Sequence, residues 1–165
     1  MHPALVNELT HFAHERGIII TIETEGSHFV ETDYPIDLLS LSPKFSNSIP
    51  VVGAVTPGGV TVDQKFVDIH NRKRMNTEAI KQMIDFHDDY HFKPVWDGTE
   101  GSLAEIEAYR VELNIPKDKT YIMPAGDTRE TLIEMYPKVF DLCAEHGYNM
   151  TGRDHIIAFD TQRMV

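Results

Sequence analysis

The residues best suited to chemistry lie in the stretch 37–48, where hydroxyls, amides and one cation follow an apolar run. Leu38, Leu39 and Leu41 form the short run that is typical of a strand buried in a parallel sheet. Pro43 ends this strand, because proline has no N–H for the ladder and restricts the residue before it. Since ligands of parallel α/β folds bind beyond the carboxyl ends of strands, this loop is a candidate ligand site.

The loop begins with Ser42, Pro43 and Lys44. A serine hydroxyl can donate and accept hydrogen bonds, and a lysine ammonium suits a carboxylate. We therefore expect Ser42 and Lys44 to face a small polar ligand. The alternative interpretation is an ordinary exit from a strand, with Lys44 simply solvated.

Two other predicted strands end in residues that would lie at the same edge. The β-branched run 18–24 leads to Glu23, which places a carboxylate where the sheet meets solvent. The run 119–123 ends at Met123, after which Pro124, Ala125 and Gly126 break the strand. A glycine there allows a backbone to approach a ligand closely, although a simple turn explains the same residues.

The elements that must position these residues alternate between buried runs and amphipathic stretches. This pattern predicts an α/β fold, with a parallel sheet of about five strands, helices on one side and the form of a partial (β/α) barrel. The predicted strands are 18–24, 37–41, 92–96, 119–123 and 155–159. We interpret residues 1–165 as a single domain, with a glycine- and proline-rich loop excursion over 49–72.

The helices are indicated by their caps and apolar stripes. Asn76 is a plausible N-cap, and Ser102 with Glu105 has the spacing of a capping box. Cys143 falls on the apolar stripe of a helix, so we interpret it as a small buried hydrophobe and not as a nucleophile. No metal site is predicted from the histidine pairs, since two histidines lack a third ligand.

Composition limits the possible partners. The 165 residues carry 15 basic and 26 acidic side chains, a formal net charge of −11. This charge argues against nucleic acid and anionic membranes as partners. No apolar run approaches the length of a membrane span, and a single cysteine gives no sign of an oxidising compartment, so a cytoplasmic protein is expected.

Several motifs together resemble the 7-carboxy-7-deazaguanine synthase family of the radical-SAM superfamily. The resemblance covers essentially the whole chain, and its motifs follow the family's order. They are Ile22-Glu-Thr-Glu-Gly26, Asp37-Leu-Leu-Ser-Leu-Ser-Pro-Lys-Phe-Ser-Asn-Ser48, His70 with Arg74 and Asn76, Phe92-Lys-Pro-Val-Trp-Asp97, Tyr121-Ile-Met-Pro-Ala-Gly126, His146-Gly-Tyr148 and Arg153-Asp-His155.

The resemblance implies a function and a set of cofactors. Members use S-adenosylmethionine (SAM), an iron-sulfur cluster (4Fe-4S) and Mg2+ to contract 6-carboxy-tetrahydropterin into 7-carboxy-7-deazaguanine, a lyase reaction in queuosine biosynthesis. It further implies that Ser42, Pro43 and Lys44 touch the ribose and carboxylate side of SAM. Residues Met123, Pro124, Ala125 and Gly126 would lie against its adenosine, and Glu23 would accept from a ribose hydroxyl.

The family binds its cluster through a Cys-x3-Cys-x2-Cys loop, and this chain has only Cys143. We therefore expect a truncated barrel that corresponds to the C-terminal two-thirds of the family's domain, and that is inactive by itself. One hypothesis is an enzyme part that supplies SAM-binding loops to a complementary N-terminal half, which brings the cluster and Mg2+ ligands. The alternative is a catalytically inactive remnant that acts as a binding or partner subunit. Because a half-barrel leaves an unpaired edge, self-association or a partner is predicted in either case.

Overall fold

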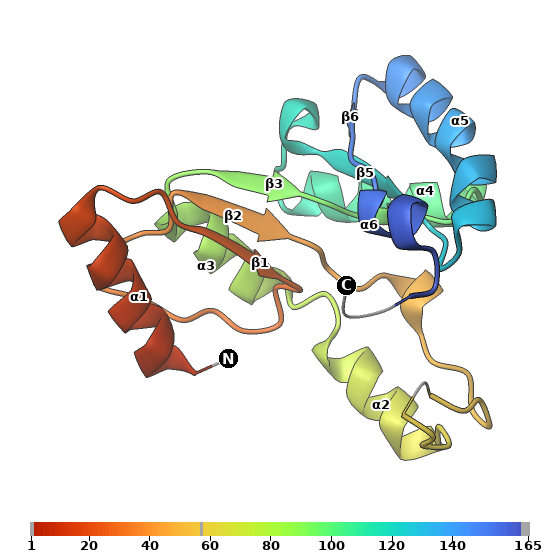
Figure 1. Ribbon diagram of the computed structural model, residues 1–165, viewed down its shortest axis with the longest axis horizontal. Coiled ribbons are helices and arrows are strands. Elements are labelled where there is room, and N and C mark those ends of the chain that lie inside the picture. Colours follow the sequence, from red (N-terminus) through yellow and green to blue (C-terminus); the bar gives the residue numbers. More distant parts are fainter. Residues whose placement is uncertain (1, 57, 163–165) are drawn as a thin grey trace.

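The computed structural model describes residues 2–56 and 58–162, and shows short parallel strands alternating with helices (Figure 1). The strands are β1 (Thr21–Thr24), β2 (Leu38–Leu41), β3 (Tyr90–Phe92), β4 (Val95–Trp96), β5 (Tyr121–Pro124) and β6 (Asn149–Met150). The α-helices are α1 (Pro3–Arg16), α2 (Gln64–Lys73), α3 (Thr77–Phe86), α4 (Glu100–Glu112), α5 (Arg129–His146) and α6 (Asp154–Phe159), and two 3-10 turns are η1 (Ser46–Ser48) and η2 (Lys117–Lys119).

The strands form two three-stranded parallel sheets, with the orders β1-β2-β3 and β4-β5-β6. The parallel pairing was predicted correctly, but the single sheet of five strands was not. The predicted strand 92–96 is divided into β3 and β4, because Pro94 has no N–H to continue the ladder. The two sheets still adjoin, since a parallel bridge links Phe92 to Thr120, and Met123 N donates to Pro94 O at 2.9 Å. The described strands do not close into a barrel.

The prediction of a strand at 155–159 was wrong, because this segment is the helix α6. Its short apolar run has no clear period, and such runs fit a helix and a strand equally well. Tertiary contacts select the helix: the Arg129 guanidinium donates from Nε to Ile157 O at 2.7 Å and from Nη2 to Ala158 O at 2.8 Å. The last strand is instead β6, which follows the left-handed Gly147 that ends α5.

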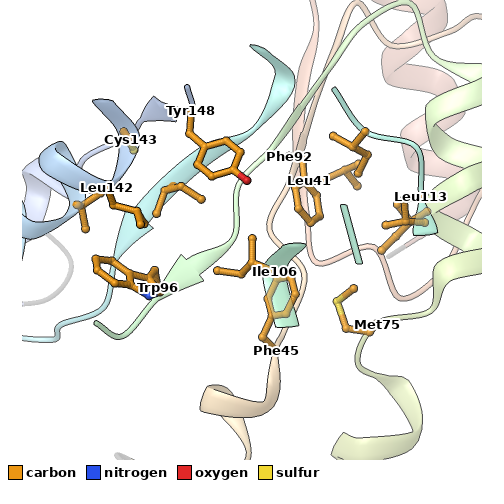
Figure 2. Close-up of a cluster of buried hydrophobic side chains, with 14 of the residues drawn as sticks. Leu41, Phe45, Met75, Phe92, Trp96, Ile106, Leu113, Leu142, Cys143 and Tyr148 are labelled. Atoms are coloured by element: carbon orange, nitrogen blue, oxygen red, sulfur yellow. The ribbon is translucent and has the colours of Figure 1, made fainter. Parts of the chain in front are cut away.

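One face of the strands carries the hydrophobic core (Figure 2). Leu41 and Phe92 are paired in the β2–β3 register and are 0% exposed. The helices between the strands cover this face, with Ile80 of α3, Ile106 of α4 and Val139 of α5 fully buried in the same cluster. The helices α3 and α4 therefore lie on one side of the strands, as expected for parallel crossovers (Figure 1).

The segment 49–72, predicted as a loop excursion, contains regular structure. An antiparallel bridge joins Val55 to Thr61, and α2 begins at Gln64, where the carboxylate of Asp63 caps the helix by accepting from Phe66 N. This segment and α2 project from the rest of the molecule (Figure 1). A membrane-spanning segment is not found among the helices of the described residues, since none combines enough length with enough hydropathy.

Candidate functional site

A polar cluster lies on the face of the first sheet opposite the core. Glu23 and Ser40 are aligned in the β1–β2 register, and their strand neighbours point into the core instead. Lys93, immediately after β3, donates from Nζ to Glu23 Oε1 at 3.0 Å and to Ser40 Oγ at 3.1 Å. Ser42 Oγ donates to the same Glu23 oxygen at 3.4 Å. We call Glu23, Ser40, Ser42 and Lys93 the Glu23 cluster.

The contacts around Glu23 favour the ionised form of its carboxylate. The hydrogen bond from Lys93 is the main cause that lowers the pKa of Glu23, and the nearby charge of Lys93, the bond from Ser42 and the charge of Lys44 act in the same direction against partial burial. The Glu23 side chain is 65% exposed and that of Lys93 only 17%. Glu23 therefore remains an ionised acceptor that a ligand can reach, whereas Lys93 holds it in place.

Two aromatic side chains continue this polar face towards the second sheet. His91 is aligned with Ser40, and its ring lies 4.2 Å from that of Tyr121, measured between centroids. Burial lowers the pKa of His91 against the opposing charge of Asp89. A neutral imidazole next to a phenol can donate and accept hydrogen bonds, so this surface is suited to a planar polar ligand.

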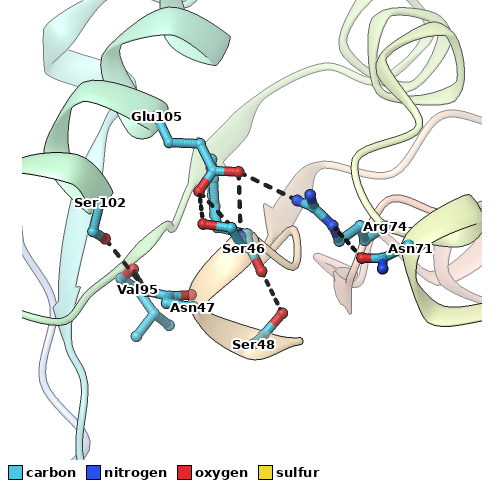
Figure 3. A network of polar contacts seen from close by, with 9 residues as sticks. Ser46, Asn47, Ser48, Asn71, Arg74, Val95, Ser102 and Glu105 are labelled. Carbon is cyan, nitrogen blue, oxygen red and sulfur yellow. Dashed lines mark hydrogen bonds and ion pairs between the residues drawn. The ribbon is translucent and has the colours of Figure 1, made fainter. Parts of the chain in front are cut away.

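The loop after β2 is fixed at the start of η1. Phe45 is 1% exposed, and its ring packs edge-to-face against Phe92 and Tyr109. The carboxylate of Glu105, on α4, accepts from the backbone N–H of Ser46 at 3.0 Å and also from its hydroxyl (Figure 3). Because residues 43 and 45 are buried, the loop presents the exposed Lys44 side chain at the edge of the sheet.

Further contacts tie this loop to distant elements (Figure 3). Arg74, after α2, donates from Nη1 to Glu105 Oε1 at 3.2 Å, and Asn47 Nδ2 donates to Val95 O at 2.9 Å. The side chains of Arg74 and Glu105 are each 20% exposed. The Glu105 carboxylate accepts from both Arg74 and a backbone N–H. Because this pair is partly buried, it restrains the loop more strongly than a solvated ion pair would.

The residues predicted near SAM fall into two groups. Glu23 and Ser42 are joined by a hydrogen bond, and Pro43 and Lys44 continue the same loop. Residues 123–126 form the end of β5 and the turn after it, and β5 is the central strand of the second sheet. Here Ala125 N donates to Trp96 O at 2.9 Å, and Arg153 donates to Gly126 O.

Gly126 has a structural explanation that the sequence did not reveal. A Cβ atom at this position would lie 2.8 Å from Thr131 Oγ1 and 2.9 Å from Leu132 Cδ2. The glycine is thus required where β5 turns into α5, whether or not a ligand approaches.

Sequence reasoning missed Ser40, Lys93 and Glu105. Lys93 lies within the predicted strand 92–96, and its sequence neighbours gave no sign that its ammonium group would reach Glu23. Glu105 was expected to complete a capping box with Ser102, but α4 begins earlier and Thr99 is its N-cap. Its carboxylate is therefore directed to the loop after β2 instead of its own helix.

The described residues do not fit an iron-sulfur cluster or a catalytic metal. The only cysteine, Cys143, is buried in the core, donates to Asn149 O, and has a pKa that burial raises to about 11. A thiol in this state is a poor metal ligand, and a cluster normally requires several thiolates. Within residues 2–56 and 58–162, no group of three or more histidine, cysteine or acidic side chains is placed to hold a metal ion.

Two curated proteins are similar to most of this chain. The 7-carboxy-7-deazaguanine synthase of Halobacterium salinarum is 30% identical over 146 residues, which is 85% of this chain and 54% of that protein. The 7-carboxy-7-deazaguanine synthase of Rhodopirellula baltica is 30% identical over 147 residues, which is 89% of this chain and 53% of that protein.

The other comparisons gave no match: no protein-family model matches the chain, and no solved structure matches it significantly. The chain spans about half the length of the curated relatives it matches. The resemblance seen in the sequence motifs is therefore confirmed: over most of its length, this chain is similar to two 7-carboxy-7-deazaguanine synthases.

Proposed function

We propose that this chain supplies part of an enzyme of the 7-carboxy-7-deazaguanine synthase type, in which its loops bind SAM. The reaction would be the radical-SAM contraction of 6-carboxy-tetrahydropterin with loss of ammonia. The observation that carries the proposal is the similarity to two such synthases, which extends over at least 85% of the chain. The position of residues 42–44 at the carboxyl edge of a parallel sheet supports it independently.

The proposed roles follow from the chemistry of the side chains. Lys44 is exposed beside Glu23 and would pair with the carboxylate of SAM, while Ser42 would donate to or accept from the ribose. Glu23 has one oxygen bound to Lys93 and the other available to accept from a ribose hydroxyl. Residues 123–126 would lie against the adenosine.

The ligands of the 4Fe-4S cluster and Mg2+ would come from the complementary N-terminal half, because the sequence has one cysteine and the described residues offer no group suited to a metal ion. In such an assembly the cluster would supply the one-electron chemistry. This chain would contribute the binding and orientation of SAM.

A complementary half is the proposed partner, and the edge of β1 is its proposed docking position. Among the described strands, β1 is an edge strand that pairs only with β2, as β6 pairs only with β5 in the other sheet. Ile19, two residues before β1, is 78% exposed, and the preceding helix α1 exposes Leu5 at 59% and Phe12 at 50%. An open strand beside exposed apolar surface favours the addition of further strands.

The test is calorimetric titration of SAM into the chain, alone and after assembly with a polypeptide that carries the family's Cys-x3-Cys-x2-Cys loop. We expect weak binding by the chain alone and no SAM cleavage. In the assembly, Lys44→Ala should weaken SAM binding roughly tenfold, because a charge-assisted hydrogen bond is lost.

The matched control is Lys81→Ala, which removes an exposed lysine from α3. If Lys44→Ala and Ser42→Ala bind SAM as tightly as the parent chain, the proposed loop is not part of the SAM site. Failure of any such polypeptide to bind the chain would favour a non-catalytic remnant.

A further inference from the structure

A small cavity lies between the loop after β2 and the C-terminal half of α2. Its volume is about 200 Å³, and it is lined by Glu25, Lys44, Phe66, Ile69, His70, Lys73 and Arg74. Lys44 belongs to the loop after β2, whereas five of the other lining residues come from α2 and the residue that follows it. We call this space the α2 cavity.

Several of the side chains that line the α2 cavity are positively charged, although the protein as a whole is acidic. The chain has a net charge of −11, yet three permanent cations, Lys44, Lys73 and Arg74, line this one space. Arg74 is bound to Glu105, and the only acidic lining residue, Glu25, accepts from Ser27 Oγ at 2.9 Å. Within the described ranges, the amines of Lys44 and Lys73 form no hydrogen bond or ion pair with the protein.

His70 adds a polar atom that lacks a partner. Its Nδ1 is buried and forms no hydrogen bond with any described residue. Buried polar atoms are nearly always paired, so this nitrogen lacks a partner that the described residues do not supply, while the His70 side chain contributes to the cavity lining. Imidazole can supply a donor to an anion, as the two amines can.

From these contacts we propose that the α2 cavity binds a small anionic group, a carboxylate or a phosphate, between Lys44, His70 and Lys73. The volume suits the head of a ligand and is below the range of pockets that enclose whole drug-sized molecules. Phe66 and Ile69 provide an apolar wall for the carbon atoms next to that head. This site extends beyond the proposed SAM loop, since it shares only Lys44 with it and requires no SAM.

The test is an NMR titration of the full chain with sodium phosphate, and separately with sodium acetate, at constant ionic strength set with sodium chloride. The ring resonance of His70, assigned with His70→Gln, should shift and saturate. The half-saturation concentration should rise roughly three- to tenfold in Lys44→Ala and in Lys73→Ala, since each removes one charged donor.

Lys65→Ala is the matched control, because it removes a charge from the first turn of α2, away from the cavity. It should change the half-saturation concentration less than about twofold. Tighter binding of phosphate would indicate a phosphate ester as the ligand, and tighter binding of acetate a carboxylate.

A shift that stays linear with both anions, or an equal loss in Lys65→Ala and Lys73→Ala, would overturn the proposal in favour of diffuse attraction. Because neither titration contains SAM, this outcome is independent of whether the SAM proposal holds.

Discussion

The loops after β2 and β5 leave the carboxyl edges of two similar parallel sheets, but different contacts hold them. Side chains hold the loop after β2: Phe45 is inserted into the core, and the Glu105 carboxylate binds Ser46. The loop after β5 is held through its backbone, since Ala125 donates to β4 and Gly126 accepts from Arg153. The first arrangement leaves Lys44 and Glu23 accessible to a ligand, whereas the second leaves mainly backbone and Met123 at the edge.

The two halves also differ in their titratable groups. In the first half, which contains β1–β3, several titratable groups have lowered pKa values, and these favour the folded state at higher pH. Burial lowers the pKa of His87 and His91, and hydrogen bonds from Lys93 and Lys119 lower those of Glu23 and Asp89 respectively. In the second half, burial raises the pKa of Cys143 to about 11. The half that contains β1–β3 should therefore be the more sensitive to acid.

The largest effect is expected from Gly126→Ala, which tests whether the loop after β5 is fixed by packing. The new methyl group would lie within 3 Å of Thr131 and Leu132 side-chain atoms, so either α5 or the strand end must shift. We expect the free energy of unfolding to fall by about 2–3 kcal/mol, measured by urea denaturation.

Gly101→Ala on α4 is the control for this substitution. A Cβ there has no atom within 4 Å, so alanine should raise the free energy of unfolding by up to about 1 kcal/mol. Equal behaviour of the two variants would refute the packing role of Gly126.

A smaller effect is expected from Glu105→Ala, which tests the side-chain anchoring of the loop after β2. Loss of the carboxylate removes the acceptor of Ser46 N and the partner of Arg74, at a cost of about 1–2 kcal/mol. Native-state hydrogen exchange at the Ser46 amide should accelerate roughly tenfold.

Glu105→Gln should give an intermediate rate, because the amide keeps one acceptor. Glu112→Ala, an exposed position on the same helix, should leave the exchange at Ser46 unchanged. If Glu105→Ala also leaves it unchanged, the loop is fixed by Phe45 alone.

The smallest effect is the difference in acid sensitivity between the halves. A group whose folded pKa is lowered stabilises the protein above its unfolded pKa, and this stabilisation is lost as pH falls towards the folded pKa. For His87 and His91 the loss begins near pH 6.5, the ordinary histidine value, and for Glu23 near pH 4.5.

Hydrogen exchange between pH 7 and 5, corrected for intrinsic rates, should therefore show amides of β1–β3 losing protection before those of β4–β6. His87→Asn should reduce this difference, since Ile36 N then no longer donates to a titrating ring nitrogen. Uniform loss of protection across both sheets would contradict the comparison.

The sequence by itself determined the start of α3, the strand β2 and the position of the candidate loop. Asn76 caps α3 as predicted, and the apolar run 38–41 is a buried parallel strand that ends before Pro43. These features depend on residues within a few positions of each other, because helix caps, strand patterns and proline effects are local.

Only the tertiary structure decided which side chains meet at that loop and how its surroundings are built. Lys93 reaches Glu23 across 70 positions of sequence, and Glu105 binds Ser46 across 59. Arg129 likewise binds carbonyls in the last turn of α6 from about 28 positions away. Such contacts depend on how separate elements pack in three dimensions, and the local pattern of residue types carries no record of that packing.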